Sequence, residues 1–276
     1  MIDIRAMGRW WTRVHRAVGV CRAYRRPVTR FLDYLGWFPQ GALSDVYLRN
    51  GMRIRARLGT SDLSIIDEVF VDGVYDRGLR SLRGGHTVID IGAQCGIFAL
   101  AAAARGAFVL CYEPVLQNLE LLRVNASLNG YDSAIVPCNA AIAAQGGVLH
   151  LYGVDRDTGG STSFPGIHPE WAQGRDVRVI EAPAVTLHEI FQHHRLVMCD
   201  LVKMDCEGAE YDVFQHAATE DLRRIRAIIM EYHPNGNIEV IAQRLRGLGF
   251  HVEMSNNPCV LFAAADEGRA VDCARH

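Results

Sequence analysis

The stretch VIDIGAQCGIF, residues 88–98, decides how this chain folds. Its first residues are apolar and β-branched, which is typical of a buried strand. Asp90 and Gly92 follow, and a second glycine, Gly96, precedes the apolar start of a helix over 97–106. A strand, a glycine turn and a helix in this order predict the nucleotide-binding corner of an α/β fold.

The segments around this stretch extend the same pattern. The sequence predicts strands at 86–92, 107–114, 133–143, 199–208 and 226–234, with helices at 97–106, 115–130, 209–217 and 237–250 between them. A closing hairpin is predicted from 251–255 and 259–265. Alternating strands and helices form a parallel sheet with helices on both faces. We therefore expect seven strands in the core, with the last pair antiparallel.

The chain divides into two predicted regions. Residues 1–85 form an N-terminal basic helix and cap, with a hairpin at 47–57 and a helix at 64–75, and residues 86–276 form the nucleotide-binding domain. Residues 145–195 interrupt the parallel pattern as an insertion, with a predicted loop at 156–166 that is rich in Gly, Ser and Thr. We expect this insertion to form a lid in which Ser161, Thr162 and Ser163 contact the substrate.

Composition excludes several classes of protein. With 49% hydrophobic residues among 276, the chain can bury a sizeable core. A net charge of −2 argues against a nucleic-acid binder, and no apolar run reaches the ~18 residues of a spanning helix. The eight cysteines form no C-x-x-C pair, which favours free thiols in a reducing compartment. We expect a cytoplasmic protein.

Charge is unevenly distributed along the chain. Residues 1–30 hold eight Arg and one Asp, a net of +7, so the other 246 residues sum to −9. A basic amphipathic helix over 9–30 can dock on an anionic membrane or an acidic partner. It can also pack apolar side chains such as Val14 and Val18 on the body of the protein. We favour packing.

The glycine turn indicates which nucleotide binds. The dinucleotide fingerprint G-x-G-x-x-G lacks its middle glycine, because Gln94 stands there, and no G-K-[ST] triplet of a phosphate loop occurs. S-adenosylmethionine has an ammonium group and no phosphate, so it suits a turn that carries a carboxylate. We assign its contacts to residues of the turn, the strand ends and the cap: Asp90, Gly92, Gly96, Glu113, Asn139 and Tyr75.

Three segments together resemble a known family. The segments VIDIGAQCG (88–96), YEPVLQNLELLRVNASLNG (112–130) and VKMDCEGAEYDVF (202–214) are similar to the FkbM family of S-adenosylmethionine-dependent methyltransferases. The resemblance covers residues 45–262, and its most specific part is K-M-D-C-E-G-A-E. It implies a Rossmann-like class I methyltransferase fold. It also implies O-methylation of a hydroxyl on a sugar, glycolipid or other specialised metabolite, of the antibiotic or polyketide type.

Four residues near the ends of two predicted strands carry the expected chemistry. A hydroxyl must lose its proton as it accepts a methyl group, so a base or a metal ion must face it. We expect Asp205 or His233 to act as the base, with Glu207 orienting the hydroxyl and Glu231 contacting the substrate. Alternatively, Asp205 and Glu231, with or without Glu207, hold Mg²⁺. We favour the version without a metal.

Other functions compete with O-methylation. N-methylation of a small metabolite requires less help from a base, and a non-catalytic protein can bind the same cofactor. Hydride transfer with a nicotinamide cofactor is a further option. The acidic residues at the expected positions favour an enzyme over a decayed binding protein. The partner that we expect is a small hydroxylated molecule and not a nucleic acid.

Overall fold

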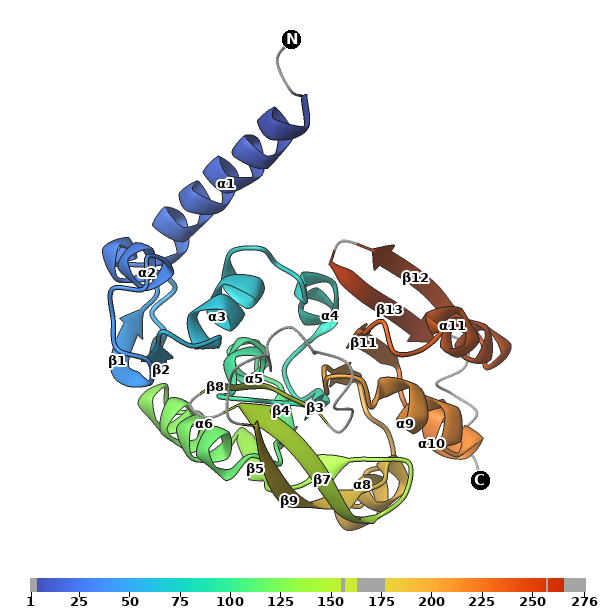
Figure 1. Ribbon diagram of the computed structural model, residues 1–276. Helices are drawn as coiled ribbons and strands as arrows, with labels where there is room; N and C mark the ends of the chain where they lie inside the picture. Colours follow the sequence, from blue (N-terminus) through green and yellow to red (C-terminus); the bar gives the residue numbers. More distant parts are fainter. Residues whose placement is uncertain (1–3, 155–156, 163–176, 257, 266–276) are drawn as a thin grey trace.

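The computed structural model describes residues 4–154, 157–162, 177–256 and 258–265. Its centre is a seven-stranded sheet in the order β12-β13-β11-β10-β3-β4-β5 (Figure 1). The strands are β3 (Thr87–Ile91), β4 (Phe108–Tyr112), β5 (Ile135–Cys138), β10 (Leu201–Met204), β11 (Ala227–Glu231), β12 (Phe250–Asn256) and β13 (Cys259–Ala265). The ladders joining β11, β10, β3, β4 and β5 are parallel, and β13 pairs antiparallel with β11 and with β12. The predicted mostly parallel sheet with an antiparallel last strand is confirmed.

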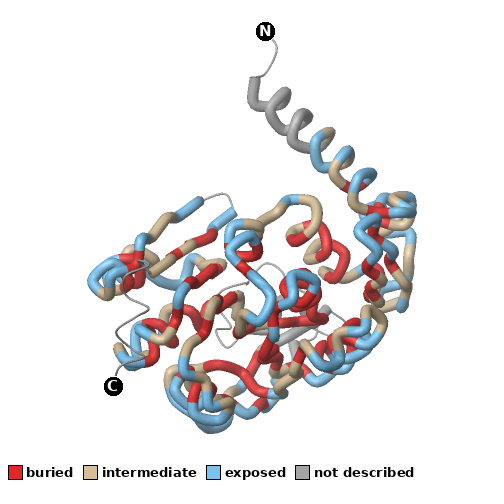
Figure 2. The backbone as a smooth tube through the Cα atoms, turned by 180° about the vertical axis from the view of Figure 1, so that it is seen from behind, coloured by how far each residue is buried: buried red, intermediate tan, exposed pale blue. Residues whose placement is uncertain are grey.

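Helices cover both faces of this sheet because its strands are apolar on both sides. They are α5 (Ile97–Ala103), α6 (Leu116–Leu128), α8 (Leu187–His193), α9 (Glu210–His216), α10 (Thr219–Arg223) and α11 (Ile238–Gly247). Val88 belongs to a buried cluster that includes α5, whereas its neighbour Ile89 belongs to a second cluster that includes α8, α9 and α11. Buried segments are concentrated in the centre of the molecule (Figure 2).

The N-terminal cap, residues 1–85, is built from helices and one hairpin. Its elements are α1 (Ile4–Ala23), α2 (Pro27–Tyr34), β1 (Ala42–Tyr47), β2 (Arg53–Leu58), α3 (Asp62–Phe70) and α4 (Asp76–Ser81). The predicted helix, hairpin and second helix are present with different bounds: the hairpin begins earlier, at Ala42, and the helix expected over 64–75 is α3, which ends at Phe70. The helix α1 projects from the body in both views (Figures 1 and 2). Val18, which we expected to pack on the body, is exposed, whereas Val20 and Tyr24 are buried.

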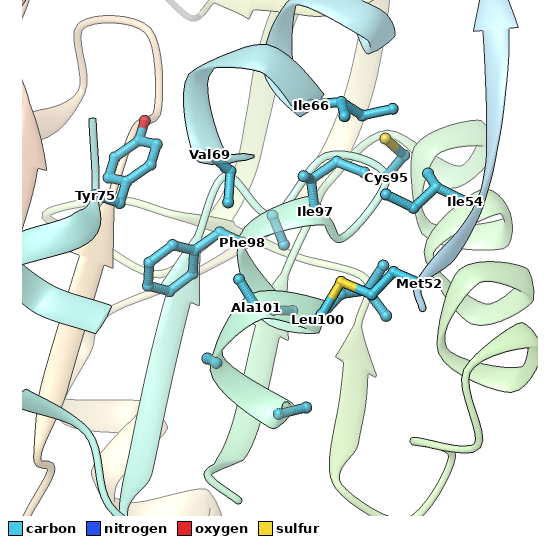
Figure 3. Packing of buried hydrophobic residues seen from close by; sticks show 14 of the residues in the cluster. Met52, Ile54, Ile66, Val69, Tyr75, Cys95, Ile97, Phe98, Leu100 and Ala101 are labelled. Carbon is cyan, nitrogen blue, oxygen red and sulfur yellow. The ribbon is translucent and has the colours of Figure 1, made fainter. Parts of the chain in front are cut away.

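The cap and the sheet share one hydrophobic cluster. It includes Ile54 and Ile66 of the cap, together with Cys95, Ile97 and the rest of the apolar face of α5. Figure 3 shows Cys95 and Ile97 close to Ile54 and Ile66. Cys95 is fully buried, so we assign it to packing beneath the cap.

Two asparagines, Asn125 in α6 and Asn129 directly after it, join the cap to the nucleotide-binding domain. Asn125 Oδ1 accepts from Arg55 N at 2.7 Å while Asn125 Nδ2 donates to Arg55 O at 3.1 Å. Asn129 does the same at Arg53, at 3.0 Å and 2.7 Å. These amides therefore bond to β2 at alternate residues, as a neighbouring strand would.

The insertion forms a second, four-stranded sheet in the order β6-β9-β7-β8. Its strands are β6 (Ala141–Ile142), β7 (Gly147–Val154), β8 (Asp157–Thr162) and β9 (Val177–Val185). The prediction of a loop throughout 156–166 was wrong, because Asp157–Thr162 pairs with β7. Pairing with a neighbouring strand supplies the order that these small polar residues do not encode locally.

No helix among the described residues combines the length and the apolar character needed to cross a membrane.

Candidate active site

The glycine turn after β3 is held against the loop after β10. Gly92 has φ 72°, and a Cβ atom on it would lie 1.8 Å from the carbonyl oxygen of Asp205. Gly96 has φ 84°, and a Cβ atom there would lie 2.8 Å from Leu122 Cγ. Both positions therefore require glycine for backbone conformation and for space. Gln94, between them, also adopts a left-handed conformation, with φ 49°.

Lys203 of β10 is paired with Asp90 of β3 and lies against the glycine turn. Its ammonium is 3.3 Å from Asp90 Oδ1 and 3.9 Å from Asp205 Oδ2, and it donates to Gly92 O at 2.9 Å. Burial lowers the pKa of Lys203, but the two carboxylates outweigh burial and raise it. Among the described residues, none donates a hydrogen bond to the buried Asp90 oxygens. Lys203 therefore holds the turn in place as a buried cation.

Glu113 follows β4 with its carboxylate directed at three N–H donors. Its Oε2 accepts from Gln94 N at 2.9 Å, and its Oε1 accepts from Val115 N at 2.8 Å and Asn118 Nδ2 at 3.2 Å. Burial raises the pKa of Glu113 to about 7, although these donors oppose the shift. The carboxylate is thus oriented by the backbone before any ligand binds.

A polar network that the sequence did not reveal connects Glu113 to the cap. Gln94, whose backbone N–H bonds to Glu113, donates from Nε2 to Asp62 Oδ1 at 2.7 Å. The buried Asp62 also accepts from Arg57 Nη2 at 2.8 Å, and that guanidinium donates to Asn118 Oδ1 at 2.8 Å. No local pattern predicts this network, because its members come from β2, α3, the glycine turn and α6.

A second cluster surrounds the hydroxyl of Tyr75. This oxygen lies 3.2 Å from Asp205 Oδ2 and 3.3 Å from Glu231 Oε2, and the ring packs edge-on against Phe98 with centroids 5.5 Å apart. A phenol has one proton to donate, so it bonds to both carboxylates best when one of them is protonated. Burial and the neighbouring Asp205 raise the pKa of Glu231 to about 7. Tyr75 thus lies between two carboxylates.

Glu68 of α3 belongs to the same electrostatic environment and was missed from the sequence. Burial, with the charges of Asp205 and Glu231, raises the pKa of Glu68 to about 8. The sequence places this residue in an ordinary amphipathic helix of the cap. Only the packing of the cap on the sheet brings it near the other carboxylates.

His233 is held between two other carboxylates. Its Nδ1 lies 2.5 Å from Glu210 Oε1 and its Nε2 lies 3.2 Å from Glu207 Oε2. Burial lowers the pKa of His233, but hydrogen bonds to these two glutamates outweigh it and raise the pKa to about 11. The ring is therefore an imidazolium at neutral pH. Ligand atoms of Asp205, Glu207 and His233 all lie within 4.8 Å of one another, so this group also has the spacing of a metal site.

One pocket connects the glycine turn and Glu113 to Tyr75 and Asp205. Its lining includes backbone and side chains from the glycine turn, from the ends of β3, β4 and β10, from the cap and from β7: Gly92, Ala93, Gln94, Glu113, Pro114, Val115, Ile142, Leu149, Leu151, Tyr75, Lys203, Asp205 and Glu207. Leu149 and Leu151 come from the insertion, so this region borders the pocket.

Other predicted site residues lie outside that lining. Asp90 lies behind the turn, and Gly96 begins α5. Asn139 is exposed, and its amide donates to the carbonyls of Glu113 and Pro114 at 3.1 Å and 2.9 Å. Ser161 and Thr162 end β8, and Ser163 lies outside the described residues. The contacts assigned to these residues stay predictions.

The chain is similar to known proteins over most of its length. It is 26% identical to the 31-O-demethyl-FK506 methyltransferase FkbM of Streptomyces tacrolimicus, over 72% of this chain and 85% of that protein. It is 24% identical to the methyltransferase sdnD of Sordaria araneosa, over 68% of this chain and 82% of that protein. Among solved structures, a SAM-dependent methyltransferase from Agrobacterium tumefaciens aligns with a TM-score of 0.45 at 12% identity, covering 83% of this chain and 72% of that one.

A family model describes more than half of the chain. Residues 90–252 match the methyltransferase FkbM domain. This range begins at the aspartate before the glycine turn and includes the lysine-bearing strand, Asp205, Glu207 and Glu231, whereas Tyr75 and Glu68 of the cap lie before it. The chain therefore belongs to the FkbM family of methyltransferases.

Proposed function

We propose that this methyltransferase uses S-adenosylmethionine to methylate a hydroxyl of a sugar, glycolipid or other specialised metabolite of the antibiotic or polyketide type. The observation that supports this most is that Tyr75 and Asp205 line the same pocket as the glycine turn and Glu113. The Tyr75 hydroxyl bonds to Asp205 and to Glu231. A base beside a cofactor pocket is what methylation of an alcohol requires.

The pocket suits this cofactor chemically. Glu113 offers a carboxylate to the ribose hydroxyls, while Pro114, Val115 and Ile142 offer an apolar wall to the adenine ring. Lys203 is the one cation among the described lining residues, and it is already paired with carboxylates and a carbonyl, as expected for a ligand without phosphate. We assign cofactor binding to the turn at Gly92 and to Glu113. The cofactor supplies an electrophilic methyl group on its sulfonium.

Asp205 is our candidate for the general base. His233 is an imidazolium between Glu207 and Glu210, so it has no lone pair with which to accept a proton. Asp205 lines the pocket and is oriented by the Tyr75 hydroxyl. Glu231, with a pKa of about 7, can share the proton that Asp205 takes from the substrate. Glu207 keeps its proposed role of orienting the hydroxyl.

One relative supports a hydroxyl target. The name of the Streptomyces protein describes an enzyme that acts on an O-demethyl form of FK506, so its acceptor is an oxygen. The second candidate mechanism, Mg²⁺ held by Asp205 and Glu231, competes with the direct base because both use the same carboxylates. The metal-like spacing of Asp205, Glu207 and His233 favours testing it, and a metal ion at this group would have to displace the proton on His233.

Titration with S-adenosylhomocysteine, followed by incubation with S-adenosylmethionine and a panel of hydroxylated and amino acceptors, tests this proposal. We expect binding, O-methyl products in mass spectra, and activity that survives EDTA. Failure to bind below ~1 mM, a free energy near −4 kcal/mol, would overturn the enzyme proposal. N-methyl products would favour the alternative acceptor, and loss of activity with EDTA that Mg²⁺ restores would favour the metal mechanism.

A further inference from the structure

The helix α2 in the cap has its charged face turned inward. Arg30 is buried, and its Nε donates to Asp67 Oδ2 at 2.7 Å. Asp33 on the same face accepts from Gly59 N at 2.6 Å. Tyr24, directly after α1, donates to the other oxygen of Asp67 at 2.6 Å. Polar contacts therefore attach α2 to the rest of the cap. A helix of a globular protein ordinarily packs through its apolar stripe instead.

Most apolar side chains of α2 and of the turn after it are exposed to solvent, with Leu32 half-buried. Val28 and Phe31 lie one turn apart on the helix and both are exposed. Tyr34, Leu35 and Trp37 continue the same stripe with 75%, 72% and 74% of their surfaces exposed. Five neighbouring apolar or aromatic side chains in water are a surface that a partner covers. We call these residues the α2 stripe.

Positive charge lies next to the α2 stripe in sequence. Arg22 lies in the last turn of α1, Arg25 and Arg26 precede α2, and all three are exposed. Within the part of the chain that the structure describes, none of the three forms an ion pair, whereas Arg16 and Arg30 nearby are paired to carboxylates. They belong to the segment 1–30, whose net charge is +7.

We infer that the α2 stripe docks on the surface of an anionic lipid bilayer, with the three arginines among the headgroups. Tyrosine and tryptophan rings are enriched at the depth where headgroups meet acyl chains, and arginine attracts anionic lipids. A second copy of the chain fits less well, because a two-fold interface would bring the same unpaired arginines together. The docking is independent of the methyl-transfer chemistry.

Sedimentation of the full chain with vesicles tests this inference. We expect the protein to sediment with vesicles of phosphatidylglycerol and phosphatidylcholine, and much less with phosphatidylcholine alone. Raising the salt from about 0.1 M to about 1 M should release it, since the screening length falls from ~10 Å to ~3 Å. Arg22→Gln/Arg25→Gln/Arg26→Gln should weaken partitioning on the order of 100-fold, at ~1 kcal/mol for each arginine. Tyr34→Ser/Trp37→Ser should weaken it about tenfold or more.

Matched controls come from the far side of the molecule. Arg223→Gln in α10 and Val240→Ser in α11 remove an exposed arginine and an exposed valine there (Figure 1). Both should leave vesicle binding unchanged, and every variant should keep the wild-type melting temperature because the side chains are exposed. Binding that is absent, or equal for wild type and both α2 variants, would overturn the inference. So would a dimer in lipid-free solution that Tyr34→Ser/Trp37→Ser dissociates, because a second copy would then cover the stripe.

Discussion

Replacing Glu113 by glutamine removes an acceptor without changing the shape of the side chain. Both carboxylate oxygens face N–H groups, at 2.9 Å from Gln94 N on one side and 2.8 Å from Val115 N on the other. An amide has one oxygen, so in either orientation its NH₂ group meets a backbone donor. The variant therefore loses one hydrogen bond to a charged group and leaves a buried N–H without an acceptor.

The size of the effect follows from these contacts. A hydrogen bond to a charged group contributes about 1.5–3 kcal/mol, and an unsatisfied buried donor costs about 1–3 kcal/mol. Relief of the burial of a carboxylate with a pKa of about 7 offsets part of this. These internal contacts set the folding stability of the variant. For S-adenosylhomocysteine, one hydrogen bond from a ribose hydroxyl to the charged carboxylate is lost, which should cost about 2 kcal/mol of binding free energy, roughly 30-fold in affinity. Isothermal titration calorimetry measures it.

The pH dependence gives a second readout in the same experiment. Hydroxyl groups donate to the ionised carboxylate, so the wild-type protein should bind S-adenosylhomocysteine about tenfold more tightly at about pH 8 than at about pH 6. Glu113→Gln should lose this dependence. Glu120→Gln, on the exposed side of α6, is the matched control and should change neither value. Wild-type affinity in Glu113→Gln, or an unchanged pH dependence, would refute the assignment of Glu113 to the cofactor.

Three further predictions concern the turn and the two carboxylate clusters. Gly92→Ala should abolish S-adenosylhomocysteine binding and lower the melting temperature far more than the control Gly130→Ala. At Gly130 the φ of 71° makes alanine cost only about 1–2 kcal/mol, because no atom lies within 4 Å of the added Cβ. Equal effects of the two substitutions would contradict the clash with Asp205. Asp205→Asn should keep binding but reduce turnover roughly 10²-fold or more with any active acceptor, and unchanged turnover would exclude it as base or metal ligand. His233→Gln should melt about 10 °C below wild type near pH 6. The pKa of His233 in the folded protein, about 11, exceeds its ordinary value of 6.5, so the stability that its ion pairs contribute is full below pH 6.5 and is lost as pH rises through about 11. A difference in melting temperature between wild type and variant that stays constant across pH would contradict the ion pairs.

Periodicity and turn chemistry made the sheet predictable. The apolar strands at 86–92 and 199–208 alternate with helices, and Gly92 and Gly96 lie where a turn needs positive φ. Asp205, Glu207, Glu231 and His233 could be grouped because parallel strands end at one edge of a sheet. These inferences depend on local sequence and on one topological rule.

Contacts between distant segments could not be predicted. Nothing in the sequence around Asp62 or Gln94 indicates that they bond to each other, and Glu68 reaches the carboxylates only because α3 packs over the sheet. The charge of His233 depends on Glu210, which lies 23 residues away in the sequence. Which face of α2 is buried could not be predicted either, since Val28 and Phe31 are exposed while Arg30 is buried. Tertiary packing decides each of these features.

The asparagine pairing on β2 has a consequence for how the enzyme can be divided. The region that matches the family begins at Asp90, yet Asn125 and Asn129 hold a strand that lies before it. A fragment starting at residue 86 would expose those amides and the apolar side of α5 at once. We expect such a fragment to aggregate, and the hairpin of the cap to exchange its amide protons together with α6 in the intact chain. The edge of β2 is also closed to other strands, which removes a site for intermolecular pairing. We therefore expect the cap and the domain that carries the glycine turn to fold as one unit. Swapping caps between relatives should fail unless Asn125, Asn129 and the facing strand β2 are exchanged together.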